Sequence, residues 1–179
     1  MISYFKKMSG GGQCPPRVRP SEIFWSWIGA FLGITPVAFL NYNLFAGSDF
    51  VYIIGSFGAS AVLIYGAVRS PLAQPRNLVG GHILSAFIGV ASYKLFYPCP
   101  WFAAAFSVAT AIAFMHLTQT LHPPGGATAL IAVIGSQKIH ALGFWYILIP
   151  VGVGVIIMLT VALIVNNMAK TRKYPEFWI

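Results

Sequence analysis

The chain has 179 residues, of which 58% are hydrophobic and 8% are charged, and its mean hydropathy is +0.76. Soluble domains carry about 25% charged residues, so this composition excludes an ordinary soluble domain and favours an integral membrane protein. The formal net charge is +8, but the basic residues form no stripe interleaved with aromatic residues, which argues against a nucleic-acid partner.

Five apolar stretches meet or approach the roughly 20 residues that a helix needs to cross a bilayer. They cover residues 23–42, 50–68, 78–97, 101–117 and 141–165, and a shorter stretch covers residues 124–136. The sequence therefore predicts an all-α, polytopic membrane protein with six transmembrane helices, of which the fifth is short. We expect a single transmembrane domain over residues 21–168, between cytoplasmic tails at residues 1–20 and 169–179.

The basic residues favour this topology, because cytoplasmic loops are enriched in Lys and Arg. With six crossings and a cytoplasmic N-terminus, nine of the 11 Lys and Arg residues lie in the cytoplasm. A re-entrant fifth stretch would instead move Lys170, Arg172 and Lys173 to the outside. The aromatic residues that we expect at the two membrane interfaces are Phe24, Trp25 and Trp27 on the inside and Tyr97, Trp101, Trp145 and Tyr146 on the outside.

The two cysteines, Cys14 and Cys99, lie on opposite sides of the membrane in this topology. A disulfide between them is then impossible, and a metal site built from cysteine is not expected.

A short internal repeat links the second and fifth stretches. Residues 58–64 read GASAVLI and residues 126–132 read GATALIA, an offset of 68 that pairs Ser60 with Thr128. The two copies lie in stretches that cross in opposite directions, which is typical of a three-plus-three inverted repeat with broken helices two and five. The match covers seven small, common residues, so a chance similarity is the alternative.

The sequence LHPPGGAT at residues 121–128 breaks the apolar pattern before the fifth stretch. Pro123 and Pro124 lack a backbone N–H and restrict the residues before them, so we expect a helix to begin near Gly126. A helix start has unpaired amides and positive dipole character, and it binds anions. With the matching break in the second stretch, the candidate anion contacts are His122, Gly125, Gly126, Ala127, Thr128, Ser56, Gly58 and Ser60. The alternative is that the prolines only kink the helix and that the small residues only allow close packing.

A second candidate stretch, SPLAQPRNLVGGH at residues 70–82, holds Gln74, Arg76, Asn77 and His82. Arg76 can offer a planar pair of donors to a small oxyanion, and Asn77 lies beside it, so both join the candidate site. The alternative is that Arg69 and Arg76 only set the topology.

The residues that are missing also narrow the function. The carboxylates Glu22, Asp49 and Glu176 all lie outside the apolar stretches, so no carboxylate pair or carboxylate proton relay is available in the membrane. No nucleophile–base arrangement or nucleotide-binding motif is present, so we expect neither an enzyme nor a cofactor. The spacing of His116 and His122 does not suit a shared metal. A site with donors and no fixed negative charge suits an anion.

Three motifs resemble those of the HPP family of integral membrane proteins: SFGASAVLIYG, SPLAQPRNLVGGH and LTQTLHPPGGATALIAVIG. The resemblance covers residues 15–165. It implies nitrite transport, in which some family members are implicated, and we expect a nitrite transporter or channel in a bacterial inner membrane. A plastid relative is the other source that the family allows. Small-residue faces could support a homo-oligomer. The alternative function is a membrane scaffold or sensor subunit that binds a partner and transports nothing.

Overall fold

The computed structural model describes residues 2–8, 12–44 and 54–179, and every regular element in these ranges is helical. The elements in chain order are α1 (Ile2–Lys6), α2 (Pro20–Phe39), η1 (Leu40–Leu44), α3 (Gly55–Ala61), η2 (Val62–Gly66), η3 (Pro71–Ala73), α4 (Pro75–Phe96), α5 (Pro100–Leu117), α6 (Pro123–Ile134), α7 (Gln137–Leu142), η4 (Gly143–Ile147), η5 (Leu148–Gly152) and α8 (Val153–Met168).

Four helical segments are long and apolar enough to cross a membrane: Pro20–Asn43, Pro75–Phe96, Pro100–Leu117 and Gln137–Met168. Two shorter apolar helices, Gly55–Gly66 and Pro123–Ile134, lie between them in the chain. The all-α prediction is confirmed, and the fifth predicted helix is short, with 12 residues. The second is also short in the described part of the chain, because it begins at Gly55. Asp49 and residues 50–53 of the predicted stretch lie outside the described residues.

The predicted span over residues 141–165 lies within the candidate membrane segment Gln137–Met168, but the helix of this segment is interrupted. Gly143 has a positive φ of 51° at the end of α7, and Ile149 has an extended backbone at φ −131° and ψ 117°. Proline disfavours the helical conformation in the residue before it, which explains the break at Ile149 ahead of Pro150. The regular helix α8 therefore begins only at Val153.

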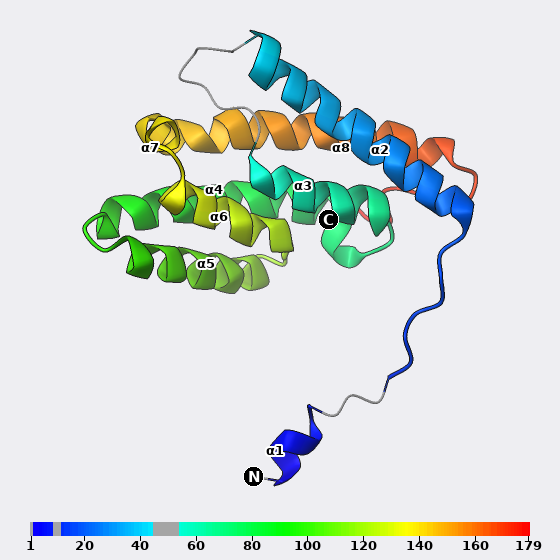
Figure 1. The fold of residues 1–179 in the computed structure, drawn as a ribbon, viewed down its shortest axis with the longest axis horizontal. Coiled ribbons are helices and arrows are strands. Elements are labelled where there is room, and N and C mark those ends of the chain that lie inside the picture. The colour runs from blue at the N-terminus through cyan, green and yellow to red at the C-terminus, as the bar shows by residue number, and fades with distance from the viewer. Residues whose placement is uncertain (1, 9–11, 45–53) are drawn as a thin grey trace.

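The helices form two packed groups with α3 between them (Figure 1). Helices α4, α5 and α6 pack on one another, and α2 packs on α8. Helices α2 and α4 run in one direction along the long axis of the molecule and α5 and α8 run in the other, whereas α3 and α6 both begin near its middle and run in opposite directions (Figure 1). Taken in chain order, the six helices α2, α3, α4, α5, α6 and α8 therefore alternate in direction. The first turns of the two short helices therefore lie deep in the membrane domain.

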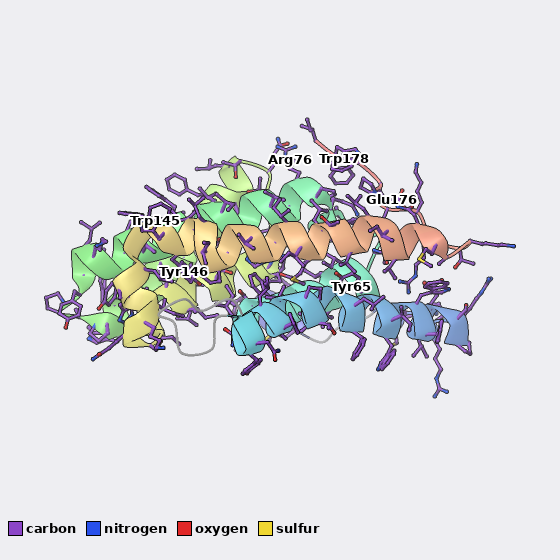
Figure 2. All side chains as sticks on the ribbon, turned by 90° about the horizontal axis from the view of Figure 1, so that it is seen from above. Tyr65, Arg76, Trp145, Tyr146, Glu176 and Trp178 are labelled. Atoms are coloured by element: carbon purple, nitrogen blue, oxygen red, sulfur yellow. The ribbon has the colours of Figure 1, made fainter. Side chains whose placement is uncertain are left out.

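Tyr65 lies in η2, directly after α3, and packs against both α2 and α8. Its ring fills a groove over Gly29 and Gly33 of α2, where an added Cβ at Gly29 would lie 2.6 Å from Tyr65 Cδ1 and one at Gly33 would overlap the hydroxyl. The hydroxyl donates to the Met158 carbonyl of α8 at 2.9 Å, and Figure 2 shows the side chain between the two helices. Pairs of glycines four residues apart often let the backbones of two membrane helices approach closely, but here Gly29 and Gly33 make room for the Tyr65 side chain.

Helices α4 and α6 approach each other through glycines. A Cβ at Gly89 would lie 2.6 Å from the Ala129 carbonyl oxygen, and one at Gly125 would lie 2.8 Å from the Gly81 carbonyl oxygen. Because backbone atoms cannot move aside, larger residues at these positions would separate the two helices. This close contact fixes the side chains of α4 against the first turn of α6.

The C-terminal tail is docked on the same end of the molecule as the start of α2. Arg172 forms an ion pair with Glu22 at 2.8 Å and donates to the carbonyl of Tyr65, to Asn166 and to Ser26. Tyr174, which is 2% exposed, donates to the Ala73 carbonyl, and burial raises the pKa of its phenol, so the hydroxyl stays protonated. The start of α2, the loop after η2 and the C-terminal tail therefore share one face.

Candidate functional site

Five polar side chains form a cluster where the two short helices meet, and all five are 0% exposed. The members of this hydroxyl–imidazole cluster are Ser56 and Ser60 of α3, His82 of α4, and His122 and Thr128 at the start of α6. Polar groups buried this deeply in a membrane domain are costly unless they bond to one another, and in such proteins they commonly mark a pathway or binding site.

Local sequence explains how each side chain reaches the cluster. Ser56 and Ser60 are four residues apart on α3, so they share one face of the helix. His122 is the residue that precedes α6, and its extended backbone (φ −139°, ψ 104°) follows from the proline after it. Thr128 lies one turn into α6, and Gly81 beside His82 lets α4 lie close enough for His82 to reach both short helices.

The hydrogen bonds form a continuous chain across the three helices. His122 Nδ1 lies 2.8 Å from the Leu72 carbonyl oxygen, and His122 Nε2 lies 3.0 Å from Ser60 Oγ. His82 then bridges the two short helices, with Nε2 at 2.7 Å from Ser60 Oγ and Nδ1 at 2.7 Å from Thr128 Oγ1. The chain ends at Ser56, whose Oγ accepts from Thr128 Oγ1 at 2.8 Å.

His82 lies between two residues that the internal repeat pairs with each other. The repeat aligns Ser60 with Thr128, and His82 has one ring nitrogen on each hydroxyl at the same distance of 2.7 Å. The bounds of Gly55–Gly66 and Pro123–Ile134 are also offset by 68 at both ends. The structure therefore brings the two copies of the repeat together around a single imidazole.

The donor and acceptor of each hydrogen bond can be assigned by starting from the Leu72 carbonyl, which can only accept. The Leu72 carbonyl only accepts, so His122 Nδ1 donates, and Nε2 of a neutral His122 accepts from Ser60. Ser60 has one proton, so it accepts in turn from His82 Nε2. In a neutral ring His82 Nδ1 is then an acceptor, and Thr128 must donate to it.

The Thr128 hydroxyl has a second acceptor, and this gives the cluster two proton states. When Thr128 donates to Ser56, as in the structure, keeping every bond requires both nitrogens of His82 to donate, which makes the ring an imidazolium. When the hydroxyl turns toward His82 Nδ1, the ring is neutral and Ser56 donates to Thr128. The cluster can thus bind one proton by rotating hydroxyl groups while every bond among its five members is kept; the longer contact of Thr128 Oγ1 with the Pro124 carbonyl, at 3.3 Å, lies outside this chain of bonds.

Apart from the carbonyls of Leu72 and Pro124, which accept hydrogen bonds, the groups around the cluster are apolar or donate hydrogen bonds. The Phe57 ring meets His82 edge-on with ring centroids 5.9 Å apart, and the His82 and His122 ring centroids are 5.0 Å apart. The Tyr146 hydroxyl donates to the Thr128 carbonyl at 3.1 Å. Among the described residues, no carboxylate bonds to any member of the cluster. A bound proton here would therefore be an uncompensated positive charge, which attracts an anion.

Not all of the predicted site residues join the cluster. Gly125 is buried against Gly81 and Ser85, and its amide donates to the His122 carbonyl at 2.7 Å. Gly126 and Ala127 line an apolar groove toward α5, and Gly58 is exposed on the outer side of α3. Neither proline has an N–H, and the hydrogen bonds that link the members of the cluster here all come from side chains.

Arg76 and Asn77 bind the loop that leads into α6. Arg76 donates from Nη2 to the Thr118 carbonyl at 2.9 Å, and Asn77 donates from Nδ2 to the Leu121 carbonyl at 2.8 Å. These bonds hold non-helical backbone next to His122. The sequence predicts that Arg76 binds an oxyanion, and in the structure its guanidinium donates hydrogen bonds to this loop.

Two parts of the site were not predicted. His82 appeared only as a neighbour of Arg76, and no spacing in its own helix could indicate that it meets both short helices. Tyr146 was predicted only as an aromatic residue of the outer interface, and its hydrogen bond to the Thr128 carbonyl of α6, with the side chain 0% exposed, was not predicted.

Comparison with known proteins gives the family. The model of the family described as HPP, transmembrane region, matches residues 15–175. Two proteins of Dictyostelium discoideum described as transmembrane proteins are 50% and 46% identical to the chain over 180 and 183 residues. Both alignments cover 99% of this chain but 58% and 64% of the relatives, so the chain spans about three-fifths of their length.

No solved structure matches the chain. The matched relatives are eukaryotic, so the bacterial inner membrane remains a prediction. The family model covers most of the sequence, including the His-Pro-Pro that places His122 in the cluster. The chain therefore belongs to the HPP transmembrane family and is an integral membrane protein.

Proposed function

We propose that the protein transports a small inorganic anion across the membrane, with nitrite as the first candidate. The observation that carries the proposal is the hydroxyl–imidazole cluster, which places donors and no carboxylate where two short helices meet. Nitrite is a small planar oxyanion that accepts hydrogen bonds from hydroxyl and imidazole groups. The family resemblance supports nitrite over other anions of that size.

The proposed architecture has six crossings, with α3 and α6 as the broken second and fifth helices of an inverted repeat. The opposite directions of the two helices and their common offset of 68 support it. Transporters of this kind bind substrate between such half-helices, near the middle of the bilayer. Because the cluster is fully buried in this conformation, α3 and α6 must part on one side at a time to admit an anion.

The proposed mechanism couples the anion to a proton on the imidazole pair. His82 and His122 share Ser60, whose single hydroxyl proton can point to either ring. Burial disfavours a charged imidazole, and an anion beside it removes that penalty, so the proton and the anion favour each other's binding. We therefore expect symport, in which one anion and one proton cross together.

The test is nitrite uptake by proteoliposomes that contain the purified protein, with and without an acid-outside pH gradient. Uptake should exceed that of empty vesicles and should rise with the gradient; empty vesicles correct for nitrous acid, which crosses lipid unaided. The variant His82→Gln should abolish the gradient-driven part. Ser92→Ala is the matched control, because the Ser92 hydroxyl is buried on the same helix but donates to its own Ile88 carbonyl.

If neither nitrite, nitrate nor chloride moves faster than through empty vesicles, the transport proposal fails. The second candidate is then a scaffold or sensor subunit, which the complete burial and saturated hydrogen bonds of the cluster favour. A stable partner that co-purifies with the protein, together with absent flux, would support that function. Flux that does not depend on the pH gradient would retain transport and reject the proton coupling.

A further inference from the structure

A basic cavity of about 700 Å³ opens at the end of the molecule where the N-terminal segment, the loop after η2 and the C-terminal tail converge. It is separate from the hydroxyl–imidazole cluster, with which it shares no residue. Four arginines and one glutamate line it, so it has a formal excess of three positive charges: Arg17, Arg19, Arg69, Arg172 and Glu22.

Within the described ranges, one of these four arginines forms an ion pair. Arg172 is neutralised by Glu22 at 2.8 Å, and its side chain is 3% exposed. Arg69 donates from Nη2 to the Thr171 carbonyl at 3.1 Å, which holds its guanidinium at the rim without neutralising its charge. In the described part of the chain, neither Arg69, Arg17 nor Arg19 forms an ion pair.

The backbone directs these charges toward one point. Arg19 precedes α2 with an extended backbone (φ −67°, ψ 149°), and both Arg17 and Arg19 line the cavity from this segment. Arg69 faces it from the loop after η2. Segments far apart in the sequence thus supply guanidinium groups to one hollow, and planar guanidinium pairs suit phosphate oxygens.

We propose that this cavity binds a phosphate group. The volume of the cavity far exceeds that of a single small anion. The cavity lies at the start of the first candidate membrane-spanning helix, where its lining residue Glu22 precedes the aromatic pair Phe24 and Trp25. The phosphate of an anionic lipid headgroup reaches this depth, and basic pockets at helix ends bind such headgroups. A soluble phosphate offers the same chemistry, and the experiment separates the two sources.

The experiment uses native mass spectrometry of the full chain in detergent, with phosphatidic acid and phosphatidylcholine added separately. Phosphatidic acid should remain bound and phosphatidylcholine should not. The double variant R17Q/R19Q and the single variant Arg69→Gln should each lower phosphatidic acid binding by about tenfold or more. The matched control is K170Q/K173Q, which removes two exposed charges from the same end but outside the cavity, and it should bind as the native chain does.

A parallel arm adds inorganic phosphate and measures the melting temperature. Stabilisation by inorganic phosphate that R17Q/R19Q abolishes, without lipid binding, would support the phosphate site with a soluble ligand. Binding of neither probe, or equal losses in the control variant and the arginine variants, would overturn the proposal. The substitutions in R17Q/R19Q lie before α2, outside the packed helices, so a loss of binding there would not reflect misfolding. The result is independent of nitrite flux.

Discussion

Among the four histidines of the chain, His82 alone has a hydroxyl at each ring nitrogen. His122 has one nitrogen fixed on a carbonyl, His140 lies 3.0 Å from the Val133 carbonyl, and His116 is exposed. A hydroxyl can donate or accept, whereas a carbonyl only accepts. His82 is therefore the histidine in which neither ring nitrogen has a fixed role as donor or acceptor.

Thr128 should be sensitive to the loss of its hydroxyl and tolerant of the loss of its methyl group. Thr128→Val leaves His82 Nδ1 and Ser56 Oγ without their partner, a cost of about 1–3 kcal/mol for a buried polar group, and should reduce nitrite uptake by roughly tenfold. Thr128→Ser keeps the hydroxyl and should retain most of the uptake. Equal uptake by both variants, at equal amounts in the membrane, would show that the hydroxyl has no role.

At the scale of the element, glycines decide how closely the helices pack. Gly33→Ala would place a methyl group on the Tyr65 hydroxyl, while Gly58→Ala meets nothing within 4 Å. Overpacking costs about 1–3 kcal/mol, so Gly33→Ala should lower the melting temperature in detergent on the order of 5 °C. Gly58→Ala should leave the melting temperature unchanged. Because alanine favours a helix over glycine, helix propensity alone would raise the melting temperature; a matching decrease in both variants would therefore show that the loss does not come from the contact with Tyr65.

The elements also show what the sequence could and could not predict. The break before α6 was predictable from Pro123 and Pro124, but the helix begins at Pro123 itself and not near Gly126 as expected, because proline is well tolerated in the first turn of a helix. The start of α3 at Gly55 was predictable from its alignment with Pro123. The break at Ile149 was not predicted, because the high hydropathy of residues 141–165 indicated a membrane span and the effect of Pro150 on the residue before it was not considered. The role of His82 was missed for another reason: its partners come from α3 and α6, and only tertiary packing brings them together.

At the scale of the whole molecule, Arg172 ties the C-terminal tail to α2, η2 and α8. Removal of one partner of a fully buried ion pair costs about 3–5 kcal/mol, but Glu22 is 29% exposed, so Arg172→Gln should destabilise the protein by less, by about 1–3 kcal/mol for the hydrogen bonds that Arg172 makes. Lys173→Gln, which changes an exposed neighbour, should have almost no effect. Thermal unfolding in detergent measures both; an Arg172→Gln protein as stable as the control would show that the tail does not hold the bundle together.

The native cysteines report the topology without an introduced label. Cys14 precedes α2 and is exposed, and Cys99 lies between α4 and α5 and is partly exposed; neither forms a disulfide. With both termini in the cytoplasm, a membrane-impermeant maleimide applied to intact cells should label Cys99 and spare Cys14. The variants Cys14→Ser and Cys99→Ser identify each signal. Labelling of Cys14 from outside would reverse the orientation, and labelling of both would refute six crossings.

The two short helices also determine how the membrane voltage acts on the protein. A helix of 12 residues is about 18 Å long at 1.5 Å per residue, whereas the hydrocarbon layer is about 30 Å thick. A voltage of 100 mV changes the energy of one elementary charge that crosses the whole layer by about 2.3 kcal/mol. If water reaches the outer end of each short helix, the membrane voltage drops across the length of the short helices and not across the full thickness of the hydrocarbon layer. An anion that travels with a proton on His82 carries no net charge, so the direction of its movement would follow the concentration gradients and not the voltage.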